Sequence, residues 1–484
     1  MARVNVNDKT FSSVQFARLS EEQCRKIHWA SLELLERVGV RLYLREAIDL
    51  LKKAGADVSD GNLVRVPSGM VEKAFTTAPG RVVLYNRHGD PVMPLQGHRC
   101  FYGPGSDTLN IVDHRTGERR DPLLKDVIQG AILCDALPNI DFVMSMVLPT
   151  DVDQTLADRH QMQAMLAHTI KPIIFVTYEL GGCVDAVEMA EAVVGGVEAL
   201  RRRPLVACYI NVVSGLVHNK ESLQKLLYLS GKGLPALYIP SSTAGVTSPV
   251  TPAGAFALDN AGTLLGLVLS QLNREGAPFV MPGMQTGPMD MRTLISTYCD
   301  PQQGIAQAMG HFYGLPMFAL GGASESKLVD QQAAAEAALT LMTASLSGGN
   351  IIHDLGYLES GLAFSFAQLV ICDEIVSWIE AFFEGIKVSA ETLALDVVAQ
   401  VGPEGQYLET QHTHAHYRER WYPDLFERAT YDAWGAQGGK SLGERAAERV
   451  EQILKEHQPE RLPDAIKQRL REIVQRSERQ SIQS

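Results

Sequence analysis

Eight short apolar segments recur along the middle of the chain, and each is followed by a polar or glycine-rich turn and then by a helical pattern. They span residues 100–103, 142–148, 173–177, 206–213, 236–240, 279–283, 317–320 and 351–354. Short, continuously apolar strands that alternate with helices are typical of a parallel sheet buried on both faces. Eight such units have the size of a (β/α)8 barrel, so we predict an α/β fold with a TIM barrel over residues 96–385.

An open, doubly wound α/β sheet is the alternative to the barrel. Such a sheet usually carries a glycine-rich phosphate-binding loop after its first strand. Residues 102–106 read YGPGS, which contains two glycines but matches neither GxGxxG nor the Walker A pattern. The pattern therefore favours the barrel.

The segment before the barrel predicts an N-terminal α+β cap over residues 1–95. Ser20 and Gln23 have the spacing of a capping box, which predicts that a helix begins there. A second helix is expected over residues 45–54, where Gly55 ends the apolar periodicity. Two short alternating stretches predict strands at residues 64–66 and 81–85.

Beyond residue 385 the pattern returns to helices, and we predict a C-terminal helical extension over residues 386–484. Residues 442–457 and 463–478 read as charged amphipathic helices. Such helices dock on the outside of a barrel or form a contact between subunits, so a homo-oligomer is expected.

Composition narrows the class of partner and the compartment. The 484 residues carry a net charge of −12, which argues against a nucleic-acid partner. The seven cysteines are scattered without zinc-site or CxxC spacing, as expected for reduced thiols in the cytoplasm. The N-terminus lacks the apolar core of a secretory signal. The longest apolar run, 255–272, contains Asp259 and Asn260, so we expect a buried helix and no membrane span.

Active sites of TIM barrels lie at the C-terminal ends of the strands. The residues expected there are Tyr102, Ser106, Asp107, Ser145, Tyr178, Glu179, Tyr209, Asn211, Ser214, Ser241, Ser242, Thr243, Met284, Gln285, Thr286, Gly321, Gly322, Ser324, Glu325, His353, Asp354, Tyr357, Glu359 and Phe364. This set has no lysine for a Schiff base and no HExxH or GxSxG motif. Amides, hydroxyls, carboxylates and aromatics indicate the binding of a small polar ligand.

Aromatic rings near carboxylates are how proteins hold quaternary ammonium groups, because the cation rests on the faces of the rings. Residues that could supply such a box are Tyr102, Tyr178, Tyr209, Tyr357 and Phe364. Aromatic residues at the rim of a barrel are often simply core residues, which is the alternative for each of them. Tyr102 and Tyr357 are favoured because small and polar loop residues surround each of them.

Three histidines, His412, His414 and His416, alternate near the C-terminus. On a strand this spacing would place them on one face, where a metal ion is conceivable. The segment offers neither a cysteine nor an obvious fourth ligand. We therefore expect no tightly bound metal and interpret the cluster as structural or as part of a docking surface.

Three segments resemble the trimethylamine methyltransferase family: FYGPGSD at 101–107, GGNIIHDLGYLESG at 348–361 and HAHYRERWYP at 414–423. The likeness extends over nearly the whole chain. Founding members of that family carry pyrrolysine at the end of a barrel strand, which corresponds to residues 353–355 here. This sequence has neither pyrrolysine nor lysine there, which resembles the non-pyrrolysine branch.

The resemblance implies an activity and a partner. Known members of the non-pyrrolysine branch demethylate quaternary amines such as glycine betaine, proline betaine, carnitine or γ-butyrobetaine. Their methyl acceptor is Co(I) of a corrinoid (cobalamin) carried by a separate protein. A quaternary ammonium leaves as a neutral amine and needs no general acid, and Co(I) needs no general base. The enzyme then has to hold the N–CH₃ bond in line with cobalt and exclude water.

This chemistry suggests roles for ten residues. Tyr102, Tyr357 and Phe364 would form the cation box, and Asp107 or Glu359 would add negative charge. His353, Asn211 and Gln285 would bind the carboxylate or hydroxyl end of the substrate. The backbone amides of Gly321 and Gly322 would also meet a carboxylate, unless these glycines serve a tight turn alone.

Three other functions stay open at this point. One is another barrel enzyme, a lyase or a metal-dependent hydrolase that acts on a small acid. A second is a non-catalytic protein that binds quaternary amines, and the third is a methyltransferase specific for trimethylamine.

Overall fold

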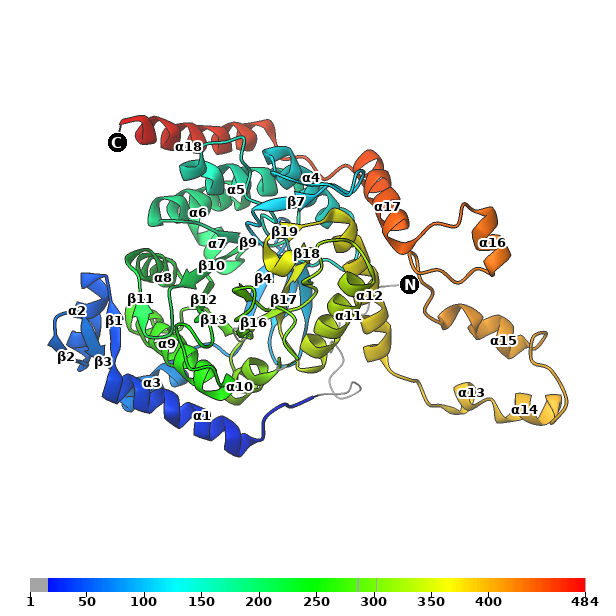
Figure 1. Cartoon of the computed structure of the whole chain (residues 1–484), viewed down its shortest axis with the longest axis horizontal. Helices are drawn as coiled ribbons and strands as arrows, with labels where there is room; N and C mark the ends of the chain where they lie inside the picture. Colours follow the sequence, from blue (N-terminus) through cyan, green and yellow to red (C-terminus); the bar gives the residue numbers. More distant parts are fainter. Residues whose placement is uncertain (1–15, 285–286, 302, 484) are drawn as a thin grey trace.

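Seven parallel strands form the central sheet of the computed structural model, which describes residues 16–284, 287–301 and 303–483 (Figure 1). Their order is β6-β17-β16-β13-β12-β10-β9. The strands are β6 (Phe101–Pro104), β9 (Ile173–Val176), β10 (Val206–Val212), β12 (Ala236–Pro240), β13 (Phe279–Pro282), β16 (Met317–Leu320) and β17 (Ile351–Leu355). Seven of the eight predicted strands are therefore confirmed.

An irregular segment, residues 141–147, closes the barrel between β9 and β6. Val143 forms a parallel bridge with Ile173 of β9. On the other side, the Asp141 amide donates to the carbonyl oxygen of Tyr102 in β6 at 2.6 Å. The predicted regular strand at 142–148 is wrong, because Met146 has a φ of 63° and interrupts the extended backbone. The predicted TIM barrel is nevertheless confirmed, with this irregular segment in the position of the eighth strand.

Eight main helices surround the barrel: α4 (Leu124–Ala136), α5 (Ala157–His168), α6 (Leu180–Val194), α8 (Lys220–Lys232), α9 (Pro252–Asn273), α10 (Ile305–Tyr313), α11 (Gln331–Leu346) and α12 (Phe366–Glu384). A short helix, α7 (Val197–Arg202), follows α6. Among the described helices, α9 has the length and apolarity to cross a membrane, but 83% of its apolar window is buried inside the protein. It is a core helix of the barrel, as its sequence predicted.

A hairpin of β4 (Val82–Tyr85) and β5 (Pro91–Leu95) closes the N-terminal end of the barrel. Leu84 and Met93 of this hairpin belong to the same buried cluster as Phe101, Phe318 and Ile351 from inside the barrel. Apolar side chains therefore fill this end of the barrel in the described part of the chain.

The N-terminal cap follows the sequence prediction closely. Helix α1 (Glu21–Glu33) begins with the expected capping box of Ser20 and Gln23, and α2 (Arg45–Ala54) ends at Gly55 with a φ of 108°. The other cap elements are β1 (Val40–Leu42), β2 (Asp57–Asp60), β3 (Leu63–Arg65) and α3 (Ser68–Thr77). Strand β1 pairs in parallel with β11 (Val217–His218), which lies in a barrel loop and ties the cap to the barrel.

Both predicted C-terminal helices are present. Helix α17 (Leu442–Glu456) has a capping box at Ser441 and packs against α12. Helix α18 (Asp464–Gln483) lies along α5 and α6 on the outside of the barrel (Figure 1).

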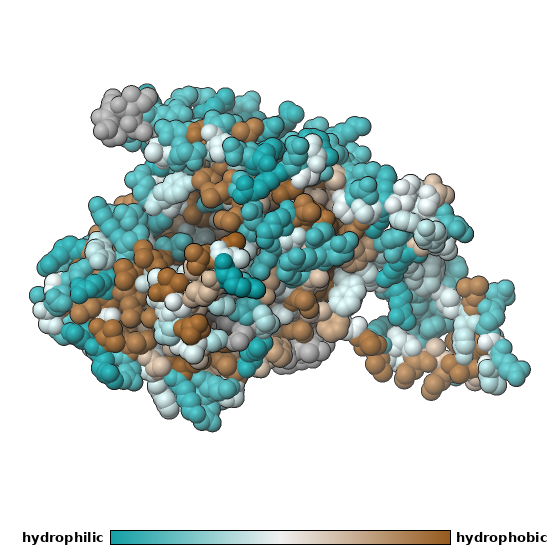
Figure 2. Space-filling model, viewed as in Figure 1, coloured by the Kyte–Doolittle hydropathy of each residue, from teal (hydrophilic) through white to brown (hydrophobic). Residues whose placement is uncertain are grey.

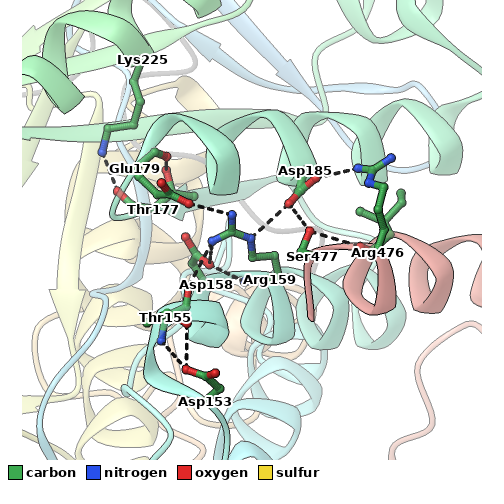
Figure 3. Close-up of polar contacts among 11 residues, drawn as sticks. Asp153, Thr155, Asp158, Arg159, Thr177, Glu179, Asp185, Lys225, Arg476 and Ser477 are labelled. Carbon is green, nitrogen blue, oxygen red and sulfur yellow. Dashed lines mark hydrogen bonds and ion pairs between the residues drawn. The ribbon is translucent and has the colours of Figure 1, made fainter. Parts of the chain in front are cut away.

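A buried ionic network fixes α18 to the barrel (Figure 3). Arg159 of α5, with a side chain only 5% exposed, contacts Asp158, Glu179 and Asp185 at 3.0–3.1 Å. Asp185 of α6 also accepts hydrogen bonds from Arg476 and Ser477 of α18, each at 2.7 Å. Since Glu179 follows β9, the same arginine connects the end of a barrel strand with the helices outside it.

Between α12 and α17, residues 386–440 project from the body as an arm (Figure 1). It contains α13 (Ala390–Leu393), α14 (Leu395–Val401), α15 (Gln411–His416) and α16 (Tyr431–Ala436), none of which has a buried side chain within the described residues. Hydrophobic side chains line part of this arm (Figure 2). The exposed apolar residues include Ile386, Val388, Leu395 and Leu408. The expected homo-oligomer stays a prediction.

The three histidines of the arm lie on helix α15 and not on a strand. In a helix, residues four apart share a face, so His412 and His416 pair with ring centroids 4.4 Å apart. His416 also contacts Glu419 at 2.8 Å. The strand interpretation is therefore wrong, and no group of three potential ligands is placed to hold a metal ion in the described part of the chain.

Candidate active site

A cavity of about 450 Å³ lies at the C-terminal ends of the barrel strands. Its polar and aromatic lining consists of Ser106, Asp107, Tyr209, Asn211, Ser241, Thr243, Ser296, Thr297, Tyr298, Asp300, Gln303, Gln307, His353, Asp354 and Tyr357. This size fits a small molecule, and the position is the one at which TIM barrels carry their active sites.

Short strands in the loops after the barrel strands build the walls of this end. Strands β7 (Asn110–Val112), β8 (Arg119–Arg120), β18 (Tyr357–Leu358) and β19 (Ala363–Phe364) form one small sheet. Strands β14 (Met289–Asp290) and β15 (Ile295–Ser296) form a hairpin in the loop after β13. The loops after β13 and β17 bring Tyr298 and Tyr357 to the cavity.

The end of β17 places a histidine and an aspartate in the cavity wall. The His353 ring stacks on Phe318, with centroids 3.7 Å apart and planes 15° apart. Its Nδ1 lies 2.5 Å from Oδ1 of Asp354, whereas its buried Nε2 has no hydrogen-bond partner among the described residues. Asp354 has a φ of 80°, and the pairing of β17 with β6 shifts register beside it. Such strained positions often occur at functional sites.

Asp107 supplies a second carboxylate. Its side chain accepts hydrogen bonds from Ser145 Oγ at 2.7 Å and from Gln161 Nε2 at 2.9 Å. Burial raises the pKa of Asp107 because the charged form loses its hydration, although the two donors oppose this shift. A cation beside Asp107 would favour the ionised form.

Three tyrosines provide aromatic surface. The rings of Tyr298 and Tyr357 have centroids 6.4 Å apart, and the Tyr357 hydroxyl donates to the carbonyl oxygen of Ser106 at 2.5 Å. Burial raises the pKa of Tyr209, Tyr298 and Tyr357, and the negative charge of Asp354 adds to this effect at each of them. They are therefore neutral phenols, whose ring faces attract cations.

The charged side chains that line the cavity are carboxylates, within the described residues. The carboxylates of Asp107, Asp300 and Asp354 line it. No lysine or arginine is present among its described lining residues. Carboxylates with ring faces and without a fixed cation make the cavity a site for a positively charged small molecule.

Four of the predicted site residues line the cavity: Asp107, Asn211, His353 and Tyr357. Gln285, the predicted partner of a substrate carboxylate or hydroxyl, lies outside the described residues. The structure therefore brings together side chains from the loop after β6, from β10, and from β17 and β18, which are far apart in the sequence.

Three other predicted residues lie outside the cavity. Tyr102 faces the surrounding helices, where its hydroxyl hydrogen-bonds to Ser345 Oγ at 2.8 Å, because its neighbour Phe101 occupies the barrel interior and successive strand residues point to opposite faces. Phe364 is fully buried behind Tyr357, with the two rings at 90°. Glu359 forms an ion pair with Arg119 at 2.8 Å.

The two glycines do not offer their amides to a ligand. Gly321 N–H donates to the carbonyl oxygen of His353 at 3.0 Å, and Gly322 N–H donates to Thr340 Oγ1 at 2.9 Å. Gly322 has a φ of 83°, so it serves the tight turn after β16. The alternative interpretation of the glycines is the correct one.

Sequence reasoning missed Tyr298, Asp300, Gln303 and Gln307. All four follow β13 by 16 residues or more, and Gln307 lies on α10. A rule based on strand ends does not reach that far along a loop. Tyr209 was among the residues considered for the cation box, and Asp354 was among the expected strand-end residues.

A parallel barrel with a polar cavity at its C-terminal end is the architecture of TIM-barrel enzymes, and comparison with known proteins specifies the class. The family model for trimethylamine methyltransferase (MTTB) matches residues 5–481. The chain belongs to this family of methyltransferases.

Individual relatives agree with this assignment. Trimethylamine methyltransferase MttB of Desulfitobacterium hafniense is 34% identical, over 96% of this chain and 94% of that protein. Glycine betaine methyltransferase of the same species is 28% identical, over 94% of this chain and 96% of that protein. The crystal structure of the hydroxylamine MtmB complex has a TM-score of 0.51 at 11% identity and covers 91% of this chain and 88% of that one, a likeness of fold.

Proposed function

We propose that the protein transfers a methyl group from a small quaternary amine to the cobalt of a corrinoid carried by a separate protein. The observation that carries this proposal is the composition of the cavity. Tyrosines 209, 298 and 357 and the carboxylates of Asp107 and Asp354 line it, without a lysine or arginine among its described lining residues. Ring faces and carboxylates are the groups that hold a quaternary ammonium.

The residues of the cavity suit a transfer that needs no proton. A quaternary ammonium leaves as a neutral tertiary amine, so the site needs no general acid. The corrinoid supplies a reduced cobalt that acts as the nucleophile. The chain contributes position: the tyrosine rings hold the ammonium, the carboxylates balance its charge, and the buried walls keep water away from the methyl group.

The size of the cavity supports a corrinoid that is carried by a separate protein. A volume of about 450 Å³ is sufficient for a small amine but far too small for a corrin macrocycle with its side chains. The corrinoid would therefore approach the barrel mouth from outside. This arrangement supports a partner protein and not a resident cofactor.

Two further observations support a quaternary substrate. Positions 353–355 carry His-Asp-Leu, so neither pyrrolysine nor lysine stands where the family resemblance places pyrrolysine. One relative is a glycine betaine methyltransferase, and the substrate in its name is a quaternary amine.

All seven cysteines, each within the described residues, are free thiols, which supports a cytoplasmic location.

A spectroscopic assay tests the proposal. The purified chain is mixed with Co(I) cobalamin or a corrinoid protein and with quaternary amines or trimethylamine, and the change from Co(I) to methyl-Co(III) is followed. We expect methylation with at least one quaternary amine and none with trimethylamine. Absence of methylation across the panel, with a corrinoid shown to be reactive, would refute the proposal.

A pair of matched variants ties the activity to the cavity. Tyr209→Ala removes a ring of the cavity wall and should lower kcat/KM about tenfold or more, the loss expected for one cation–π contact in a desolvated site. Tyr43→Ala removes a tyrosine that is 55% exposed in the cap. This control should keep the activity of the parent chain.

A further inference from the structure

We propose that the substrate is a carboxylate-free quaternary ammonium with a hydroxyl arm, of the hydroxyalkyl-trimethylammonium class, whose hydroxyl donates to Nε2 of His353. This inference rests on the proposed function and narrows its substrate. It departs from the betaines that the family resemblance implies.

The charges of the cavity disfavour a carboxylate. A betaine has a negative group a few bonds from its ammonium, and a buried carboxylate requires a cation or several donors to replace its hydration. The described lining contains no lysine or arginine. It contains instead the carboxylates of Asp354, which is buried, and of Asp107, which is half-buried. A betaine carboxylate in this cavity would lie among groups of its own charge.

The hydrogen-bonding state of His353 indicates what the other end of the substrate carries. Nδ1 of His353 lies 2.5 Å from Oδ1 of Asp354. The carboxylate accepts, so Nδ1 carries the proton and, in the neutral ring, Nε2 is an acceptor. This Nε2 is buried without a partner among the described residues, and His353 lines the cavity. A buried acceptor of this kind calls for a donor, which a hydroxyl provides and a carboxylate does not.

A second acceptor points the same way. Gln307 is 2% exposed and lines the cavity, and its Oε1 is buried with no hydrogen-bond partner in the described part of the chain. His353 lies at the end of β17, whereas Gln307 lies on α10. Two side chains from separate elements that line the cavity therefore each carry a buried acceptor without a partner, and the described lining holds carboxylates and no lysine or arginine. A cation with a hydroxyl balances the carboxylates and donates one hydrogen bond, which we assign to Nε2 of His353.

The position of His353 is fixed well enough to select a hydroxyl. Its ring stacks on Phe318 at 3.7 Å on one side, and Asp354 holds Nδ1. A ring that is held in this way can present Nε2 in one direction without losing conformational entropy on binding. His353 is thus a specificity-determining residue of the proposed reaction.

Binding measurements on the full chain test the inference without any corrinoid. Isothermal titration calorimetry compares choline, tetramethylammonium and glycine betaine. We expect choline to bind about tenfold more tightly than tetramethylammonium, as one hydrogen bond to a buried acceptor would give, and more tightly still than glycine betaine. Equal or tighter binding of glycine betaine, or no binding of any probe, would overturn the inference.

Two variants separate the role of His353 from a loss of fold. In His353→Leu the ratio of choline to tetramethylammonium affinity should fall to about one, because the acceptor is gone. His353→Gln restores a side-chain oxygen and should recover part of the ratio. A His353→Leu variant that melts like the parent chain and keeps the full ratio would overturn the role of Nε2.

The binding and methylation experiments distinguish a failure of the substrate inference from a failure of the proposed function. If choline is preferred in binding but no amine methylates the corrinoid, the methyl transfer fails and the substrate inference stands. If methylation occurs with glycine betaine in preference to choline, the methyl transfer stands and the substrate inference fails.

Discussion

The hydroxyl of Tyr357 donates to the carbonyl oxygen of Ser106 at 2.5 Å, and this bond joins the loop after the last barrel strand to the loop after the first. The two strands, β17 and β6, pair in parallel beside it. Gly105 lies at the same seam, where a Cβ atom would overlap both Tyr357 and the Asp354 carboxylate. The cavity wall is therefore closely packed at this seam, where the position of Gly105 has no space for a side chain.

Removing the Tyr357 hydroxyl separates the role of this hydrogen bond from that of the ring. Tyr357→Phe keeps the ring face and loses one hydrogen bond, so kcat/KM should fall by less than about tenfold. Tyr357→Ala also removes aromatic surface from the cation site and should cost about a hundredfold, mostly through KM. Steady-state kinetics with the best amine of the panel measures both. Equal losses in the two variants would assign the effect to the hydrogen bond alone.

Adding a methyl group at Gly105 should abolish activity. In Gly105→Ala the new Cβ displaces Tyr357 or Asp354, and overpacking of this kind costs about 1–3 kcal/mol of stability. Gly69→Ala is the matched control, because its Cβ meets no atom within 4 Å and it lies in helix α3. Alanine is favoured there by about 0.5–1 kcal/mol. Thermal melts and the corrinoid assay together test the pair, and an active Gly105→Ala enzyme would contradict the prediction.

The sequence predicted the fold well because hydrophobic periodicity is a local property. Apolar runs located seven strands, and caps such as Ser20 with Gln23 located the helix starts. The segment at 142–148 was the exception among the barrel strands. Its apolar run is real, but Met146 adopts a left-handed conformation that no residue pattern around it signals.

The site was predictable only in part, because it depends on side-chain direction and on long loops. Strand ends pointed to Asp107 and His353, which line the cavity. Tyr102 could not be placed, since the face to which a strand residue points depends on register, and one step along β6 moves it from the interior to the helices. Tyr298 comes from a loop whose path is set by tertiary contacts.

The buried network at Arg159 should be essential for stability. Replacing Arg159 with methionine keeps the volume but leaves the buried carboxylate of Asp158 without its cation and Asp185 with Arg476 alone, which should cost about 3–5 kcal/mol. Part of this loss should appear as release of α18, because Asp185 also holds Arg476 and Ser477 (Figure 3).

A surface pair provides the control for Arg159. Arg45 and Asp49 form an ion pair at 3.0 Å with side chains 75% and 53% exposed. Arg45→Met should therefore change the free energy of unfolding by no more than about 0.5 kcal/mol. Urea unfolding of both variants, with limited proteolysis of the α18 segment, measures the contrast. A stable Arg159→Met protein would mean that the network contributes little net energy.

Asp107 should link pH, stability and ligand binding. Its pKa in the folded protein is raised by burial above the unfolded value of about 3.9. The folded state thus binds the proton more tightly, and this contribution to stability is fully present below about pH 4 and is lost as the pH rises through the folded pKa. Asp107→Asn keeps an oxygen that accepts from Ser145 and Gln161 but buries no charge. We therefore expect the variant to be more stable than the parent chain at neutral pH, with a difference that shrinks as the pH falls toward about 4.

The same substitution should weaken the binding of a cation, because the ionised carboxylate is what balances the ammonium. Saturating tetramethylammonium should raise the melting temperature of the parent chain more than that of Asp107→Asn, and the gap should widen with rising pH. Melting curves with and without the cation, taken from acidic to neutral pH, measure both effects. A variant that is less stable than the parent chain at every pH, or that responds to the cation equally, would show that Asp107 is a structural hydrogen-bond acceptor and not part of the cation site.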